Sequence, residues 1–241
     1  MCFCAPAKAC SWHNCALLTT LNLTPGWKMT RILYVQASPR GTHSASAQVA
    51  HAYIDALKAR GQVNVDLLDV WHENLPEFNG AAMEAKYAGL AGQALNAPQQ
   101  AAWNAIKALG ARFSNADQIV ISAPMWNFGV PYRLKHLIDL VSQKDVTFTF
   151  DDSGFGGMLK KQRAVVVCAR GLGYTEGTPM SEENFDYQRA YLTSWLSFLG
   201  VTDIKTIRVE KTLFGAEACS ASVAEGVAEA VAIAKSVPLA S

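Results

Sequence analysis

The sequence predicts an α/β fold, a three-layer sandwich in which a five-stranded parallel sheet in the order 2-1-3-4-5 lies between layers of helices. Two observations favour it. Strand-like and helix-like segments alternate five times along the chain, which is typical of the units that build a parallel sheet. Three strand-like runs, at 31–36, 116–124 and 163–169, are short and almost continuously apolar, as expected for strands that helices cover on both faces.

The first half of the chain opens with the apolar strand at 31–36. Residues 47–61 then carry apolar side chains at helical spacing, and Gly61 ends the predicted helix. A second strand is predicted at 63–70. Residues 71–97 show no regular pattern, and the next helix is predicted to begin at Pro98.

The second half repeats the alternation. After the strand at 116–124, a helix is predicted from Pro131 to about Val141. Residues 147–157 alternate in polarity and then reach several glycines, which indicates a small hairpin or flap. The remaining predicted elements are a strand at 163–169, a helix at 184–200, a strand at 203–210 and an alanine-rich helix from about 216 to 235.

Composition excludes several classes of partner. The chain has 241 residues, of which 50% are hydrophobic and 17% are charged, and its net charge is +1. It contains no block of like charges, so neither nucleic acid nor an anionic membrane surface is an expected partner. No apolar run approaches the roughly 20 residues of a membrane span. The expected partners are therefore small molecules.

The N-terminal segment differs from the rest of the chain. Residues 1–28 are irregular, and a strand begins directly after Met29, so we expect a disordered extension followed by one domain over 29–241. The extension holds four of the 6 cysteines, but their spacing lacks the Cys-x-x-Cys pairs of common zinc sites. The domain itself has only Cys168 and Cys219. This usage is typical of a reducing compartment, and we expect a cytoplasmic protein.

The loop after the first strand is rich in hydroxyl groups. Ser38, Thr42, Ser44 and Ser46 lie in the segment SPRGTHSAS, and Ser44 precedes the predicted helix. Free backbone N–H groups and the positive end of a helix dipole suit a phosphate group. A plain helix cap is the alternative interpretation of Ser44. The glycine fingerprints of dinucleotide-binding folds and of P-loop enzymes are absent.

The loop after the third strand is unusually apolar. In PMWNFGVP, three bulky side chains surround one asparagine, Asn127, between Pro124 and Pro131. Apolar walls and a single polar side chain suit a flat ring with a polar edge, such as a flavin. The alternative is a loop that packs its aromatic residues internally.

The loop after the fourth strand, ARGLGYTEG, adds two glycines and a cation. Gly171 and Gly173 permit close approach of the backbone, and Arg170 supplies positive charge. Taken alone, the segment also fits an ordinary flexible turn. Together, the three loops predict a site for a mononucleotide with a flat ring, with the phosphate at the first loop.

These stretches resemble the FMN-dependent NADH-azoreductases, which also act as NADH:quinone reductases. The resemblance extends over roughly residues 30–237, and PMWNFGVPYRLK is its most specific part. It implies a flavodoxin-like fold, bound FMN, NADH as electron donor and a homodimer with its site at the interface. The FMN-binding residues it implies are Ser38, Ser44, Ala45, Ser46, Met125, Trp126, Asn127, Phe128, Ala169, Arg170, Gly171 and Leu172.

Two features depart from the family pattern. Trp126 stands where a tyrosine is usual, and Ala169 and Leu172 replace a serine and a glycine, so backbone contacts are expected to dominate in that loop. The resemblance implies ping-pong electron transfer through FMN to quinones or azo bonds, and no catalytic side chain is named because the flavin carries the chemistry. Two alternatives stay open, an electron carrier that binds a protein partner and a non-catalytic redox sensor.

Overall fold

A computed structural model describes residues 29–174 and 180–239. Its central sheet consists of β1 (Thr30–Gln36), β2 (Val63–Asp69), β3 (Gln118–Pro124), β6 (Arg163–Ala169) and β7 (Asp203–Val209). The helices are α1 (Ala45–Lys58), α2 (Gly80–Leu90), α3 (Ala97–Asn115), α4 (Tyr132–Val141), α5 (Glu182–Phe185), α6 (Tyr187–Phe198) and α7 (Ala216–Ser236). β4 (Phe148–Asp151) and β5 (Gly154–Gly157) form a separate hairpin, and a single 3₁₀ turn covers Gly41–His43.

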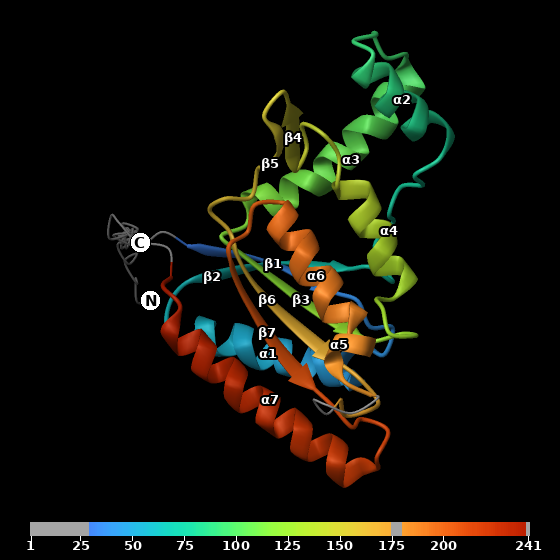
Figure 1. Cartoon of the computed structure of the whole chain (residues 1–241). Coiled ribbons are helices and arrows are strands. Elements are labelled where there is room, and N and C mark those ends of the chain that lie inside the picture. Colours follow the sequence, from blue (N-terminus) through green and yellow to red (C-terminus); the bar gives the residue numbers. More distant parts are fainter. Residues whose placement is uncertain (1–28, 175–179, 240–241) are drawn as a thin grey trace, which may run out of the picture.

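The sheet confirms the predicted topology. Its strands are parallel and run in the order β2-β1-β3-β6-β7, which is the expected 2-1-3-4-5 arrangement (Figure 1). The three central strands are buried along nearly their whole length, which explains their continuous apolar sequences. The outer strands β2 and β7 are less buried, with only Leu68 buried in β2 and Ile207 and Val209 in β7, because each has a neighbouring strand on one side only.

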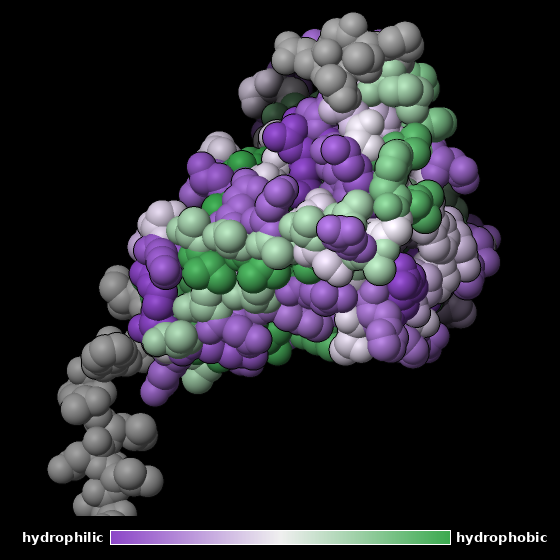
Figure 2. Space-filling model, turned by 90° about the horizontal axis from the view of Figure 1, so that it is seen from below, coloured by the Kyte–Doolittle hydropathy of each residue, from purple (hydrophilic) through white to green (hydrophobic). Residues whose placement is uncertain are grey.

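Helices cover both faces of the sheet. On one face α1 and α7 lie side by side against Tyr34, Val120 and Val167 (Figure 1). On the other face α3, α4 and α6 pack against Leu33, Ile121 and Val166. Alternate residues of one strand therefore serve two different cores. From the side on which α7 lies, apolar and polar residues intermingle on the surface, as expected for an alanine-rich helix with an outer face (Figure 2).

The structure corrects two boundaries. Helix α2 forms within 71–97, where no regular element was predicted, because its apolar residues do not gather on one side and leave no stripe for pattern analysis to detect. The helix predicted at 184–200 is divided into α5 and α6, since Asp186 takes a non-helical conformation and caps α6 by accepting a hydrogen bond from the backbone N–H of Arg189. The hairpin predicted within 147–157 is present as β4 and β5.

The expectations for residues 1–28, including the cysteine-rich segment, lie outside the described residues. Among the helices that are described, none is long and apolar enough to cross a membrane.

Candidate functional site

A cavity of about 490 Å³ lies beyond the carboxyl ends of the parallel strands. This is the edge at which ligands bind in open α/β sheets. The loops after β1, β3, β6 and β7 border the cavity, together with the first turns of α1 and α7. Seven of the predicted residues line it, namely Ser38, Ser44, Ala45, Met125, Ala169, Arg170 and Gly171.

The loop after β1 builds the polar end of the cavity. Ser44 is the N-cap of α1, and its hydroxyl accepts a hydrogen bond from the backbone N–H of Ala47 at 3.4 Å. Its hydroxyl also lies 3.0 Å from that of Ser46, which is fully buried and supports Ser44 from within the helix. Ser44 therefore caps the helix and also borders the cavity, while its contact with a phosphate stays a prediction.

The sequence analysis did not consider two basic residues beside this helix start. Arg40 and His43 are exposed and line the same cavity, and they precede Ser44 by four residues and by one residue. The segment PRGTHS contained the information, because a basic residue next to a helix N-terminus strengthens an anion site. The prediction of a phosphate site rested on the hydroxyl groups of this segment alone.

The loop after β3 is a tight turn with unusual backbone geometry. The backbone N–H of Trp126 donates to the carbonyl of Gly129 at 3.1 Å, and the N–H of Gly129 donates to the carbonyl of Trp126 at 2.9 Å. Between them, Asn127 and Phe128 take positive φ values of 48° and 67°. Non-glycine residues rarely occupy this left-handed region, although asparagine is tolerated there better than most residues. The turn therefore holds the backbone at Asn127 in an uncommon conformation, with the residue exposed.

The aromatic side chains of this turn pack mostly against other aromatic residues. The ring of Trp126 lies 5.6 Å from that of Trp71 and 6.3 Å from that of Tyr132. The ring of Phe128 lies 5.1 Å from that of Phe185. The indole N–H of Trp71 donates to the carbonyl of Ala37, so this cluster also fixes the loop after β1.

A second, more open cavity of about 1040 Å³ lies on the other side of the turn. Trp126 and Asn127 line it, with residues of α4 and α6 such as Tyr132 and Tyr191. The structure thus divides the predicted residues between two neighbouring spaces. Of the described candidates, Ser46, Phe128 and Leu172 line neither cavity.

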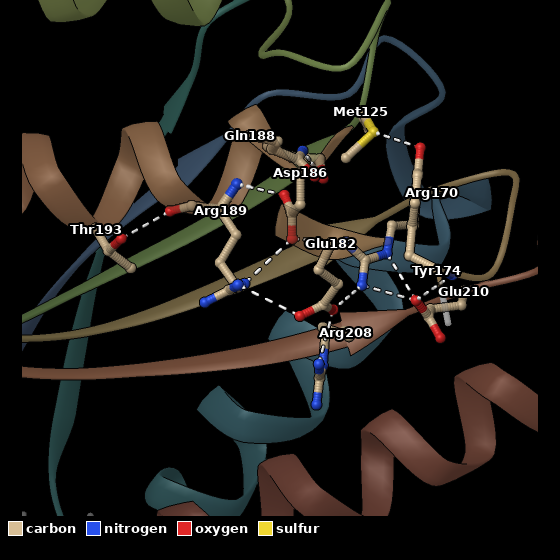
Figure 3. A network of polar contacts seen from close by, with 11 residues as sticks. Met125, Arg170, Tyr174, Glu182, Asp186, Gln188, Arg189, Thr193, Arg208 and Glu210 are labelled. Atoms are coloured by element: carbon tan, nitrogen blue, oxygen red, sulfur yellow. Dashed lines mark hydrogen bonds and ion pairs between the residues drawn. The ribbon is translucent and has the colours of Figure 1, made fainter. Parts of the chain in front are cut away.

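The loop after β6 departs from the expectation for Arg170. Its side chain has no exposed surface, and the guanidinium contacts the carboxylates of Glu182, Asp186 and Glu210 (Figure 3). Burial lowers the pKa of Arg170, but the hydrogen bonds and charges of the carboxylates raise it more, so the group stays cationic. The charge is consequently neutralised inside the protein, and Arg170 presents no free cation to the cavity.

The last part of the wall comes from a segment without a recognisable pattern. Thr212 and Leu213 follow β7, and Cys219, Ser220 and Val223 lie in the first turns of α7, where they border the same cavity. In the sequence these positions belong to an alanine-rich helix and the turn before it. Only the packing of α7 beside α1 brings them to the site.

One end of the cavity is basic and contains the start of a helix, and the other end is apolar. The start of α1, Arg40 and His43 form the first, while Pro124, Met125 and Ala169 contribute to the second. Within the part of the chain that the structure describes, no group of three or more histidine, cysteine, aspartate or glutamate residues is arranged to hold a metal ion. The fold and cavity therefore define an α/β protein of the mononucleotide-binding class.

The chain belongs to the flavodoxin-like fold family, which matches residues 30–233, and within it to the FMN-dependent NADH:quinone oxidoreductases. It is 50% identical over 192 residues to FMN-dependent NADH:quinone oxidoreductase 9 of Burkholderia lata, a match that covers 78% of this chain and 90% of the relative. It is 45% identical over 207 residues to FMN-dependent NADH:quinone oxidoreductase 2 of Pseudomonas syringae pv. tomato, with 86% and 98% covered.

Solved structures share the fold. An azoreductase from Bacillus anthracis str. Sterne superposes with a TM-score of 0.77 at 24% identity, covering 87% of this chain and 100% of that one. An FMN-dependent NADH-azoreductase from Bacillus anthracis str. Ames Ancestor, solved in complex with FMN, gives a TM-score of 0.74 at 24% identity, with 86% and 100% covered. The predicted family and fold are thereby confirmed.

Proposed function

We propose that this protein is an FMN-dependent oxidoreductase that transfers electrons from NADH to quinones and to the azo bonds of aromatic azo compounds. The observation that carries the proposal is the cavity of about 490 Å³, whose anion-binding end adjoins an apolar end at the strand edge. The relatives named as FMN-dependent NADH:quinone oxidoreductases, at 50% and 45% identity, support the same assignment.

The residues present fit FMN. The phosphate end of the cavity offers the first-turn N–H groups of α1, the Ser44 hydroxyl and the positive charge of Arg40. The apolar end of the cavity reaches Met125. We expect the flat ring to lie against Met125 and against the adjoining turn at 126–129, whose Trp126 and Asn127 border the neighbouring second cavity. At the edge of that turn, Asn127 supplies a directed amide for the polar edge of the ring.

The chain's own contribution to the reaction is binding and orientation. When bound, FMN would supply the redox chemistry, a hydride transfer from NADH and a two-electron reduction of the second substrate in ping-pong order. Ser44 and the start of α1 would hold the phosphate, and the backbone of 169–171 borders the cavity beside Met125, whose N–H donates to the carbonyl of Ala169. We assign no protein acid or base to the reaction.

We further propose a homodimer in which the second cavity lies at the contact between subunits. This cavity is largely apolar, and Tyr132 and Tyr187 on its wall are 65% and 61% exposed. Aromatic surface of this extent is typical of an interaction site. Light scattering should give twice the chain mass of 26.0 kDa, and a mass of one chain at micromolar concentration would contradict the dimer.

The domain assignment also remains a proposal. We expect that a chain beginning at Met29 folds and binds FMN, because the family match begins at residue 30. Loss of solubility or of flavin binding in the shortened chain would assign a structural role to residues 1–28.

The function is tested by flavin content and turnover. The purified protein is expected to bind FMN, to be reduced by NADH under anaerobic conditions and to reduce menadione with consumption of NADH. Riboflavin in place of FMN is the matched control, because it keeps the ring and lacks the phosphate. If FMN binds but NADH does not reduce it, the protein is an electron carrier or a sensor, and the enzyme assignment is wrong.

A further inference from the structure

Arg170 occupies the centre of a buried ion cluster directly beneath the cavity wall. Its Nη1 donates to Asp186 at 2.6 Å, its Nε to Glu210 at 2.9 Å, and its Nη2 contacts Glu182 (Figure 3). Arg189 and Arg208 add two further cations around the same carboxylates. Three guanidinium groups thus face three carboxylates, and only Arg170 contacts all three of those carboxylates.

The same residue fixes the backbone that borders the cavity. The N–H of Arg170 donates to the carbonyl of Val209 at 2.8 Å, and its carbonyl accepts from the backbone and the hydroxyl of Thr212. The preceding carbonyl, of Ala169, accepts the backbone N–H of Met125 at 2.7 Å. Two walls of the cavity are therefore tied together at this position.

Tyr174 links Arg170 to Met125 at the apolar end of the cavity. The Arg170 guanidinium lies 4.6 Å from the centre of the Tyr174 ring. The hydroxyl of Tyr174 donates to the sulfur of Met125 at 3.3 Å. A contact path thus runs from the buried cation through one aromatic ring to a side chain on the cavity wall.

Stability alone does not account for such a cluster. Desolvation of buried ions offsets most of their attraction, so well-packed apolar residues would stabilise the fold about as well. The cluster instead orients the segments that carry the carboxylates, because the planar guanidinium binds its three partners at set angles. Those partners come from α5, from the Asp186 cap of α6 and from the segment after β7.

We propose that Arg170 is a positioning residue of the flavin site, which sets the 169–172 backbone and Met125 against the flavin ring without touching the cofactor. The inference rests on the proposed FMN function. It differs from direct recognition of the phosphate, which the free charge of an exposed arginine would provide. Because the Arg170 side chain is wholly buried, its effect reaches the flavin only through the loop.

The two roles predict different ligand dependence. A phosphate ligand contributes to FMN binding and not to riboflavin binding, because riboflavin has no phosphate. A positioning residue affects both flavins by the same factor, since the ring is common to them. The test therefore compares dissociation constants for FMN and riboflavin, measured by fluorescence quenching on the full-length apo-protein.

Arg170→Lys keeps the charge and removes the planar fork. It is expected to weaken FMN and riboflavin equally, by about tenfold, the order of magnitude for one lost charged hydrogen bond. The absorption spectrum of bound FMN should change, and the melting temperature of the apo-protein should fall, because lysine cannot make all the hydrogen bonds of the buried guanidinium. Arg208→Met is the matched control, because it removes a cation from the same cluster without contacting the loop, and it should leave both constants unchanged.

Several outcomes would overturn the proposal. Parent-like binding of both flavins by Arg170→Lys would show that the fork is dispensable, and a loss confined to FMN would indicate direct phosphate contact. Equal losses in Arg170→Lys and Arg208→Met would indicate that any disturbance of the ion cluster weakens binding, with no special role for Arg170. If Arg170→Lys does not fold, Glu210→Gln removes one partner of the fork and is judged by the same comparison. A parent protein that binds neither flavin would overturn the proposed function, and this inference with it.

Discussion

Replacement of Ser44 by alanine separates its two roles. The hydroxyl caps α1 through Ala47 and forms a hydrogen bond with the buried hydroxyl of Ser46. Loss of an N-cap costs about 1 kcal/mol, and the long 3.4 Å bond places Ser44 at the lower end of that range. With the partner of Ser46 also removed, we expect a total loss of about 1–2 kcal/mol in the free energy of unfolding. For a domain of this size that loss lowers the melting temperature by about 2–8 °C.

The effect on the ligand is larger if the phosphate lies where we propose. A hydrogen bond from a hydroxyl to a charged phosphate contributes about 1.5–3 kcal/mol, so Ser44→Ala should raise the dissociation constant of FMN by about 10- to 100-fold. Riboflavin binding should stay nearly unchanged, as should turnover of enzyme saturated with FMN. Titration of the apo-protein by fluorescence quenching measures both ligands.

Asn96→Ala is the matched control for the cap. Asn96 caps α3 through a reciprocal pair of bonds with Gln99, each 3.0 Å, and lies on an exposed surface outside both cavities. It should lower the melting temperature by a similar amount and leave FMN binding intact. If Ser44→Ala binds FMN as the parent does, or weakens riboflavin equally, the phosphate does not lie at the start of α1.

Three further predictions address other groups. Asn127→Gly removes the amide, and glycine adopts the positive φ of 48° without strain. The binding of FMN and of riboflavin should therefore weaken alike, by about 10- to 100-fold. Unchanged titrations would show that the turn has only a packing role. Burial raises the pKa of Glu182, but hydrogen bonds from Arg208 and Arg170 hold this pKa below the ordinary value of 4.5. The ionised Glu182 therefore stabilises the fold above pH 4.5, and this stabilisation is lost as the pH falls through the lower folded-state pKa. Glu182→Gln should therefore be less stable than the parent at neutral pH in urea unfolding, and the difference should shrink below about pH 4.5; a constant difference would contradict the ion pairs. Iodoacetamide should label Cys219, which borders the cavity, but not Cys168, because burial raises the pKa of that thiol to about 12. Saturating FMN should slow the labelling of Cys219, which peptide mapping by mass spectrometry measures. Undiminished labelling would place the flavin elsewhere.

The sequence alone determined the sheet and most of its helices. Continuous apolar runs at 31–36 and 163–169 indicate strands covered on both faces, and the hydroxyl-rich and apolar loops between them indicate where a ligand binds. These signals are local, because burial acts on each residue through its own side chain. Helix α2 was not predicted because its apolar residues do not form a stripe on one side, so the local pattern carries no helical signal.

Only the tertiary structure decided which partners the charged side chains of the loops have. Nothing in ARGLGYTEG shows that Arg170 is paired with Glu182, Asp186 and Glu210, because those residues follow by 12, 16 and 40 positions and meet it only when α5, α6 and β7 pack. The same packing gives the cavity its wall from α7 and leaves Arg40 and His43 as its exposed basic residues. A local pattern records which side of an element is buried, whereas the partner of a buried charge depends on the register and angle at which distant elements meet.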